Sequence, residues 1–217
     1  MVKKKTPRLP RGVFVTFEGI DGSGKTTQAK LLYRALKKEG RPVVLFREPG
    51  GTKVAEKLRQ ILLQEKSEPI SSRAEILLYV ASRAQLVEQK IKPALRAKKM
   101  IICDRYVDST TAYQAYGRGF DPDWVEKLNR WGSSEILPEI TFLIDVPVAV
   151  GLARKRGKLL DRLEREGKRF EQKVHRGYHR LAKKHRRIRI MDGTPPPAEV
   201  AKGVKKLVDD YLKKVEK

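Results

Sequence analysis

Five short runs of apolar residues recur along the chain, separated by stretches with helical periodicity. The runs cover residues 13–17, 43–46, 100–103, 140–146 and 188–191. Their length and β-branched content predict buried strands. Apolar residues at helical spacing predict helices over residues 27–39, 52–65, 72–97, 124–133 and 197–214, and a further one over 148–184 that is interrupted near Gly157 and Gly167. This alternation predicts an α/β fold in which a parallel sheet carries helices on both faces.

Candidate functional side chains follow each apolar run. Residues 18–26, 47–52 and 104–106 come directly after the first three runs, Asp145 closes the fourth, and residues 192–194 follow the last. In parallel sheets of this kind, ligands bind at the carboxyl ends of the strands. We therefore expect the functional site at this edge of the sheet.

The loop after the first strand matches the phosphate-binding pattern G-x-x-x-x-G-K-[ST]. A predicted strand precedes this loop and a predicted helix follows it, and this context disfavours the alternative of a chance glycine-rich turn. Glycines let backbone N–H groups face an anion, and the helix N-terminus adds a favourable dipole. Lys25 can reach the β- and γ-phosphates of a nucleotide, and the Thr26 hydroxyl can bind Mg²⁺. The residues expected to bind ATP are Gly19, Ile20, Asp21, Gly22, Ser23, Gly24, Lys25, Thr26 and Thr27.

Length and cysteine content indicate one intracellular domain. The 217 residues suit a single domain spanning 1–217. The one cysteine, Cys103, lies in an apolar run and is expected in the core, which fits a reducing compartment. No apolar run approaches the length of a membrane span, and no signal-like segment follows the basic N-terminal arm, residues 1–11. We therefore expect a cytoplasmic protein that does not bind membranes.

The net charge of +23 is extreme, with 49 lysines and arginines against 26 aspartates and glutamates. Such a chain attracts polyanions, including nucleotides and nucleic acid. The densest basic block covers residues 154–189. It could form a phosphate-facing lid or a nucleic-acid patch, but we expect most of its residues to form a solvated helix face. Nucleic-acid binding stays an alternative, although no motif that reads nucleic acid is present.

Two acids at strand ends compete for the role of organising a metal. Asp104 is followed by Arg105, so a carboxylate that can hold Mg²⁺ stands beside a guanidinium that can clamp a phosphate. Asp145 has no basic neighbour in the sequence and ranks lower. A structural ion pair is the alternative for Asp104 and Arg105.

Two further segments suggest a pocket for an acceptor molecule. Arg47 and Glu48 precede Pro49 and two glycines, where the backbone can approach a ligand closely. Tyr79 and Arg83 lie at i, i+4 on one helix face, and a ring with a guanidinium suits a flat, hydrogen-bonding base. The alternative is that Tyr79 is a core residue and Arg83 a surface residue.

Two weaker signals are interpreted as structural. His175 and His179 have an i, i+4 spacing that can bind zinc, but no third ligand clusters with them in the sequence, and a surface role is expected. Trp124 and Trp131 are expected in the core or at an interface.

Taken in order, the segments 17–27, 47–52, 82–85 and 104–106 resemble the thymidylate kinase (dTMP kinase) family. The resemblance runs along nearly the whole chain. It implies a three-layer P-loop kinase fold with a five-stranded parallel sheet and a mobile lid, here residues 151–168. The implied reaction is ATP + dTMP → ADP + dTDP with Mg²⁺, in dTTP biosynthesis, by a homodimer. Another nucleoside monophosphate kinase of this fold is the alternative.

The resemblance also implies roles for individual residues. Arg47 and Arg105 would grip the acceptor phosphate, Tyr79 would stack on thymine, and Arg83 would bond its carbonyl edge. Asp21 would face the sugar 3′-hydroxyl or a metal-bound water. The segment with Ser109, Thr110 and Tyr113 would close over the sugar and base, with Tyr113 crowding a 2′-hydroxyl. Lys25, Asp104 and Arg105 are thus the catalytic candidates, and Thr26 and Asp104 the metal ligands.

Gly22 departs from those members that carry an arginine inside the phosphate-binding loop. Members without that arginine place a catalytic one on the lid. Arg156, just before Gly157, is the first candidate for this role here and Arg162 the second. Residues 157–161 are one longer than the usual pattern, so the resemblance leaves both candidates open.

Overall fold

One parallel sheet organises the molecule. The computed structural model describes residues 9–64, 68–157 and 159–216. Among these residues, five strands pair in the order β2-β3-β1-β4-β5, every pair parallel. They are β1 (Val13–Glu18), β2 (Val43–Arg47), β3 (Met100–Asp104), β4 (Ile140–Asp145) and β5 (Ile188–Asp192). All five predicted strands are confirmed, and four of them extend one residue beyond the predicted end. Each of the five strands ends in a charged residue.

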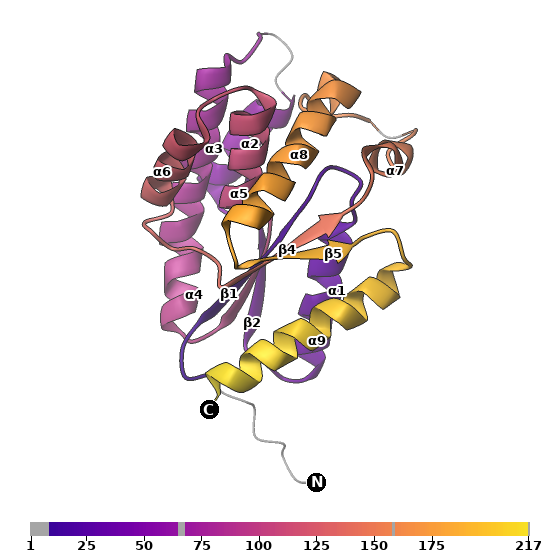
Figure 1. Cartoon of the computed structure of the whole chain (residues 1–217). Helices are drawn as coiled ribbons and strands as arrows, with labels where there is room; N and C mark the ends of the chain where they lie inside the picture. The colour runs from indigo at the N-terminus through magenta and orange to yellow at the C-terminus, as the bar shows by residue number, and fades with distance from the viewer. Residues whose placement is uncertain (1–8, 65–67, 158, 217) are drawn as a thin grey trace.

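Helices cover both faces of the sheet (Figure 1). On one face lie α1 (Lys25–Lys38) and α9 (Pro197–Val215). The other face is covered by α3 (Ser72–Leu86), which continues through a π-helical turn (Val87–Ile91) into α4 (Lys92–Arg96), and by α5 (Val107–Thr110), its π-helical extension (Thr111–Gly117) and α8 (Lys168–Lys184). Helices α2 (Lys53–Gln64) and α6 (Pro122–Gly132) pack on α3. The expected three-layer architecture is confirmed.

The segment from Val107 to Gly117 is helical, and the sequence pattern did not predict it. Its threonines, serine and glycine are weak helix formers. Burial and side-chain bonds stabilise it instead: the Asn129 Nδ2 donates to the Val107 carbonyl and to Thr111 Oγ1, both at 3.0 Å. Tertiary contacts therefore override local propensity in this segment.

The predicted interruption of the long basic helix is confirmed. Helix α7 (Val148–Ala153) ends within the first residues of the segment 151–168, which the resemblance implies as a lid, and α8 begins at the last residue of that segment, Lys168. Between them, Gly157 and Gly167 have φ angles of +75° and +85°, values that break a helix, and the described residues of this segment contain a short 3₁₀ turn (Glu164–Glu166). The segment that the resemblance implies as a lid thus connects two helices on the same edge of the sheet.

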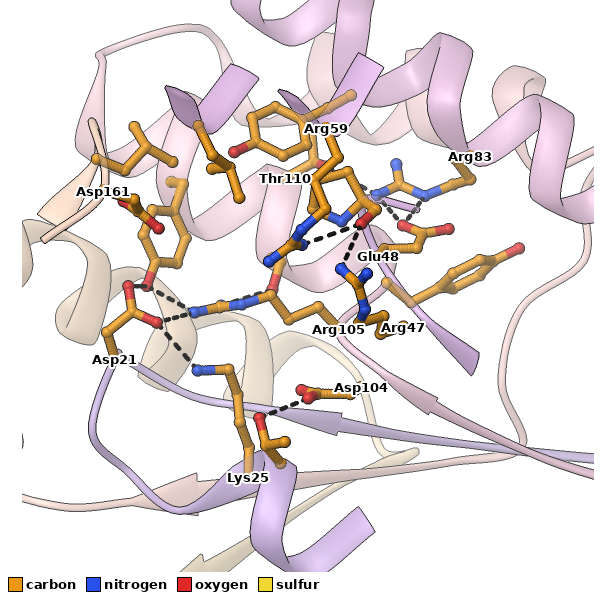
Figure 2. A pocket seen from close by; sticks show the side chains of 18 of the residues that line it. Asp21, Lys25, Arg47, Glu48, Arg59, Arg83, Asp104, Arg105, Thr110 and Asp161 are labelled. Atoms are coloured by element: carbon orange, nitrogen blue, oxygen red, sulfur yellow. Dashed lines mark hydrogen bonds and ion pairs between the residues drawn. The ribbon is translucent and has the colours of Figure 1, made fainter. Parts of the chain in front are cut away.

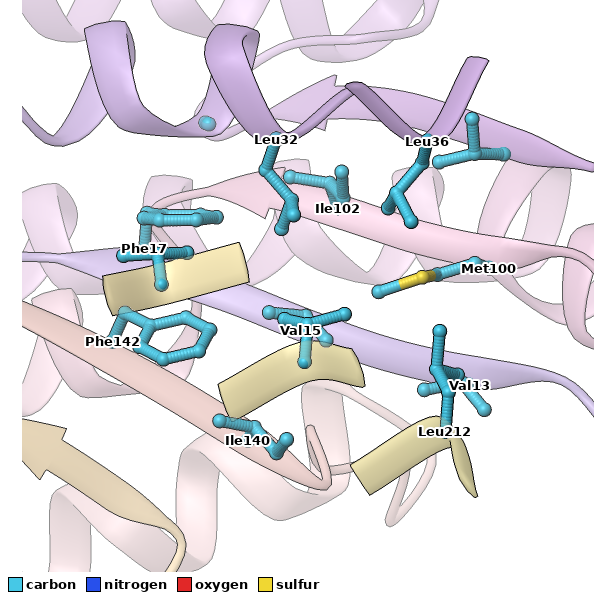
Figure 3. Packing of buried hydrophobic residues seen from close by; sticks show 14 of the residues in the cluster. Val13, Val15, Phe17, Leu32, Leu36, Met100, Ile102, Ile140, Phe142 and Leu212 are labelled. Carbon is cyan, nitrogen blue, oxygen red and sulfur yellow. The ribbon is translucent and has the colours of Figure 1, made fainter. Parts of the chain in front are cut away.

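The central strand β1 is buried on both faces. Val13, Val15 and Phe17 pack against Leu32 and Leu36 of α1 (Figure 3). On the opposite face, Phe14 packs with Cys103, which is a buried free thiol as expected. A core on each side fixes the direction in which β1 delivers the phosphate-binding loop. None of the helices within the described ranges combines the length and apolarity that a membrane span requires.

Candidate active site

The loop after β1 has the geometry of an anion cradle. Gly24 caps α1 in a left-handed conformation with φ 99°, and α1 begins at Lys25. Gly22 has φ +78°, and a Cβ there would lie 2.2 Å from the Gly151 carbonyl oxygen. Helix α7 therefore packs so closely on this loop that no side chain fits at position 22, which agrees with the departure noted in the sequence.

A first pocket opens above this loop. Its basic groups are Lys25, Arg154 and Lys155. The Arg154 guanidinium donates to the Gly22 and Ser23 carbonyls, each at 3.3 Å, and to Gly193 at 3.0 Å. The end of α7 is therefore fastened to the phosphate-binding loop and to the loop after β5. We call this cavity of about 560 Å³ the P-loop pocket.

A second cavity, of about 290 Å³, lies at the carboxyl ends of β1, β2 and β3 (Figure 2). We call it the acceptor pocket. All eight residues expected to bind an acceptor line it: Asp21, Arg47, Tyr79, Arg83, Arg105, Ser109, Thr110 and Tyr113. They come from four separate segments, and the sheet order β2-β3-β1 brings those segments together.

The two pockets meet at a shared cluster of charges. Asp21, Lys25, Thr26 and Glu164 line both. The Lys25 ammonium lies 3.1 Å from Asp21 Oδ1, and the Arg105 guanidinium bonds the same oxygen. Burial acts to raise the pKa of Asp21, but the positive charges of Arg105, Lys25 and Lys155 outweigh it and hold that pKa well below its usual range. An ionised carboxylate thus gathers cations where two phosphates would touch.

Thr26 and Asp104 form an oxygen-donor pair next to this cluster. The Thr26 hydroxyl donates to Asp104 Oδ2 at 2.5 Å. The other carboxylate oxygen, Asp104 Oδ1, is buried and has no hydrogen-bond partner among the described residues. A hydroxyl and a carboxylate with an unused oxygen are the hard ligands that Mg²⁺ prefers. These two residues therefore fit a magnesium ion.

Arg83 is buried, not a surface residue, so that part of the alternative interpretation is wrong. It is 1% exposed. Its Nε donates to Glu48 at 2.9 Å, and its terminal nitrogens donate to Asn129 at 2.6 Å and Thr110 at 2.8 Å. Burial acts to lower the pKa of Arg83, but Glu48 raises it overall, so the guanidinium stays charged. The side chain is therefore held rigidly at the wall of the acceptor pocket.

Neither lid arginine named from the sequence lines a pocket in this conformation. The Arg162 guanidinium donates to the Leu62 carbonyl at 2.9 Å and to Glu75 at 2.5 Å, which ties it to α2 and α3. Arg156 is exposed. Two other basic residues of the segment 151–168, Arg154 and Lys155, line the P-loop pocket. Lys155 pairs there with Glu164 at 2.5 Å.

Sequence reasoning missed several residues of the acceptor pocket: Glu48 as the partner of Arg83, Arg59 of α2, and Asp161, Leu163 and Glu164 of the lid. Arg59 sits among charged residues of an amphipathic helix, which offered no signal. The acids Asp161 and Glu164 offered one, because they interrupt a dense basic block.

Asp145 and the two histidines lie together in the structure, so the prediction that each lacks such neighbours is wrong. Asp145 lines neither pocket. It does have basic neighbours, because His175 and His179 lie 2.8 and 3.2 Å from its two carboxylate oxygens. The histidine pair therefore has a third potential ligand, which comes from another part of the chain and is invisible to sequence spacing.

Two buried carboxyl groups lie behind the charge cluster. Glu18 accepts hydrogen bonds from the Tyr106 backbone N–H at 2.7 Å and from Ser109 at 2.5 Å, next to Arg105. Burial, together with the charge of Asp108, raises its pKa to about 7. Glu171 of α8 is 3% exposed, and its Oε2 has no partner among the described residues. Burial and the nearby Asp21 raise its pKa to about 7 as well.

Glu171→Gln is expected to stabilise the protein at pH 8 but not at pH 4.5. The carboxyl group binds its proton more tightly in the folded state, with a pKa of about 7, than in the unfolded state, with an ordinary pKa of 4.5. Its contribution to stability is therefore complete below pH 4.5 and is lost as pH rises to about 7. Glutamine is neutral throughout, so the gain above pH 7 is about 1–3 kcal/mol.

Thermal unfolding of both proteins across this pH range measures the effect. Glu199→Gln, at an exposed position of α9, is the matched control and should leave the pH profile unchanged. A difference between Glu171→Gln and the original chain that stays constant from pH 4.5 to pH 8 would contradict the assignment.

The chain is similar to known proteins in sequence and in fold. The family model described as thymidylate kinase matches residues 17–204. The thymidylate kinase of Caldanaerobacter subterraneus subsp. tengcongensis is 48% identical over 204 residues, covering 94% of this chain and 98% of that protein. That of Fervidobacterium nodosum is 43% identical over 200 residues, covering 92% and 100%. The crystal structure of thymidylate kinase from Ehrlichia chaffeensis superimposes with a TM-score of 0.75 at 37% identity, covering 92% of this chain and 99% of that one.

Proposed function

The chain belongs to the thymidylate kinase family and is a phosphotransferase acting on dTMP, and we propose that ATP is its donor and that each nucleotide occupies one of the two pockets. ATP would lie on the loop of residues 19–27, and dTMP would lie in the acceptor pocket. The product would be dTDP, for dTTP biosynthesis. Residues 1–217 would act as one kinase domain, with residues 151–168 as the lid; residues 1–8 of the basic arm lie outside the described residues.

The observation that carries this proposal is the shared wall of the two pockets. Asp21, Lys25 and Thr26 line both, so phosphates bound on either side would meet there. Phosphoryl transfer needs in-line positioning and cations around the moving group, with little covalent help from the protein. Lys25 and Arg105 converge on one carboxylate oxygen and supply two of these cations.

Magnesium would be held by Thr26 and Asp104. When bound, the ion neutralises charge on the donor phosphates. The contribution of the protein is to present a hydroxyl and a carboxylate in fixed positions at the ends of α1 and β3. Arg47, at the end of β2, would hold the acceptor phosphate from the opposite side of the pocket.

The base and sugar would be selected by the rest of the acceptor pocket. Tyr79 would stack on thymine. Arg83 would donate to the carbonyl edge of thymine. Contacts with Glu48, Asn129 and Thr110 fix the plane of the guanidinium and leave one of the two Nη1 hydrogens available for this bond. Tyr113, whose hydroxyl lies 3.2 Å from Asp21, would crowd a 2′-hydroxyl and so favour deoxyribose.

A coupled ADP-release assay with dTMP, dUMP and dCMP as acceptors tests the substrate. We expect turnover to be confined to dTMP and its close analogues. Equal turnover of dCMP would instead favour another nucleoside monophosphate kinase of this fold.

A homodimer would form through the helices α2, α3 and α6. Large apolar side chains are exposed on these three neighbouring helices: Val54, Ile61, Leu77, Trp124 and Trp131. Trp131 is 76% exposed, so the expectation that it lies in the core is not met and an interface is the remaining interpretation. Contiguous exposed apolar surface marks a protein–protein contact. We propose a cytoplasmic location, because the single cysteine, Cys103, is buried and has no second cysteine in the chain with which to form a disulfide.

Leu77→Glu combined with Trp131→Glu is expected to give a monomer, because two charges would be buried without partners in the interface. Light scattering after gel filtration measures the mass. Ile190→Glu is the matched control, since Ile190 is 49% exposed but lies on β5, away from these helices, and should leave the mass unchanged. A double variant of unchanged mass would rule out this interface.

A further inference from the structure

A cluster of three metal-binding side chains lies outside both pockets. Asp145 is the last residue of β4, and His175 and His179 are one turn apart on α8. The Nε2 atom of His175 lies 2.8 Å from Asp145 Oδ1, and that of His179 lies 3.2 Å from Asp145 Oδ2. The ligand atoms all lie within 4.8 Å of one another. Each imidazole thus faces a different oxygen of one carboxylate.

The cluster is built on rigid elements and open to solvent. The strand end and the helix fix the backbone of all three residues. Asp145 and His175 are each 26% exposed and His179 is 35% exposed, so an ion and its water ligands have access. The Nε2 atom of His179 is buried, yet it makes no hydrogen bond to the described residues. A nitrogen lone pair or N–H is therefore left unused at the centre of the cluster.

We propose that Asp145, His175 and His179 bind one divalent transition-metal ion of the Zn²⁺ class, with water completing the coordination. Two imidazole nitrogens and one carboxylate oxygen are a donor set that Zn²⁺, Co²⁺ and Ni²⁺ prefer, and a poor one for Mg²⁺. At bond lengths of about 2.0–2.1 Å, tetrahedral ligands lie about 3.3 Å apart. The observed contacts of 2.8 and 3.2 Å need to open by only a few tenths of an ångström.

This ion would be distinct from magnesium in the active site. The pair Thr26 and Asp104 offers oxygen donors only, whereas Asp145 and the two histidines line neither pocket. The position of the cluster gives the ion a structural consequence. Asp145 stands three residues before α7 and both histidines lie on α8, the two helices that anchor the lid. A bound ion would link the end of β4 to α8 and so stabilise the folded chain, since it binds the folded state alone.

Metal titration of the untagged full-length protein tests the site. After chelator treatment, Zn²⁺ binding is measured by calorimetry without nucleotide or Mg²⁺, and Co²⁺ binding by its visible absorption. We expect one ion per chain, a rise in melting temperature with Zn²⁺, and no displacement by excess Mg²⁺. His175→Ala and His179→Ala should each weaken Zn²⁺ binding by about tenfold or more, because each removes a ligand.

His185→Ala is the matched control. His185 is the third histidine of the chain, caps the end of α8 and pairs with Glu126 at 3.2 Å. Its loss should leave Zn²⁺ affinity unchanged. Equal affinity in the original chain, His175→Ala and His179→Ala, or no Zn²⁺ binding by the original chain, would overturn the proposal. If either alanine variant has a lowered melting temperature in the presence of chelator, Asp145→Asn and His175→Gln are measured in its place. Zn²⁺ affinity equal to that of the original chain would again overturn the proposal.

Discussion

Arg105→Met is expected to lower kcat/KM for dTMP about a thousandfold, because it removes a cation placed where charge develops during transfer. In the structure, the guanidinium bonds Asp21 and donates to Ser109 at 3.0 Å and to the Gly19 carbonyl at 3.2 Å. It therefore connects the phosphate-binding loop to the acceptor pocket.

The loss should divide between binding and turnover. A charged hydrogen bond contributes about 1.5–3 kcal/mol, so dTMP affinity should fall about 10- to 100-fold, and the rest should appear in kcat. Arg105→Lys keeps the charge but loses the planar fork, and we expect it to recover affinity more than turnover. Steady-state kinetics with a separate dTMP binding titration measures both.

Arg118→Met is the matched control for Arg105→Met. The two arginines are equally buried, at 16% and 17% exposed. Each also lies 5.0 Å over an aromatic ring and is paired with a carboxylate. Arg118 lines neither pocket. Its variant should therefore lose stability without a large loss of kcat/KM. A similar loss of kcat/KM in both variants would show that Arg105 acts through folding, not through the reaction.

The strands and the phosphate-binding loop were predictable because their signals are local. Each strand is a short segment dominated by apolar residues, so its position follows from the sequence within one residue. The loop of residues 19–26 is a contiguous motif whose glycines have a direct backbone reason: Gly22 and Gly24 both have positive φ.

Partnerships across the fold were not predictable, because they depend on which segments the sheet places side by side. Glu48 follows β2 and Arg83 lies on α3, yet they form a buried ion pair at 2.7 Å. Asp145 and His175 are 30 residues apart and meet only because α8 packs over the end of β4. From the sequence, Asp145 and the two histidines each ranked low because no suitable partner lies nearby in the chain. In the fold, the carboxylate and the histidines are partners of one another.

Arg156→Ala is expected to lower kcat about a thousandfold while changing dTMP affinity little, because a lid arginine acts on the transition state and not on the bound acceptor. The structure gives this proposal a mechanical basis. Lid residues 154–157 follow α7, whose Gly151 packs against Gly22 of the phosphate-binding loop. Arg156 is exposed three residues after the helix ends at Ala153, so a modest closure of the lid would carry its guanidinium toward the donor phosphates.

Three lid arginines allow this assignment to be tested by comparison. Arg165, exposed and bonded to the Leu160 carbonyl at 3.2 Å, is the control, and Arg165→Ala should keep nearly full turnover. Arg162 is tied to Glu75 and Leu62, so Arg162→Ala should lower stability as well as turnover. Single-turnover rates and dTMP affinities distinguish the candidates. An Arg156→Ala enzyme that loses affinity as much as rate, or that turns over normally while Arg162→Ala does not, would transfer the catalytic role to the second arginine. In that case the lid could close only after the Arg162–Glu75 ion pair breaks. Closure would then be slower than with the exposed Arg156 as the catalytic residue.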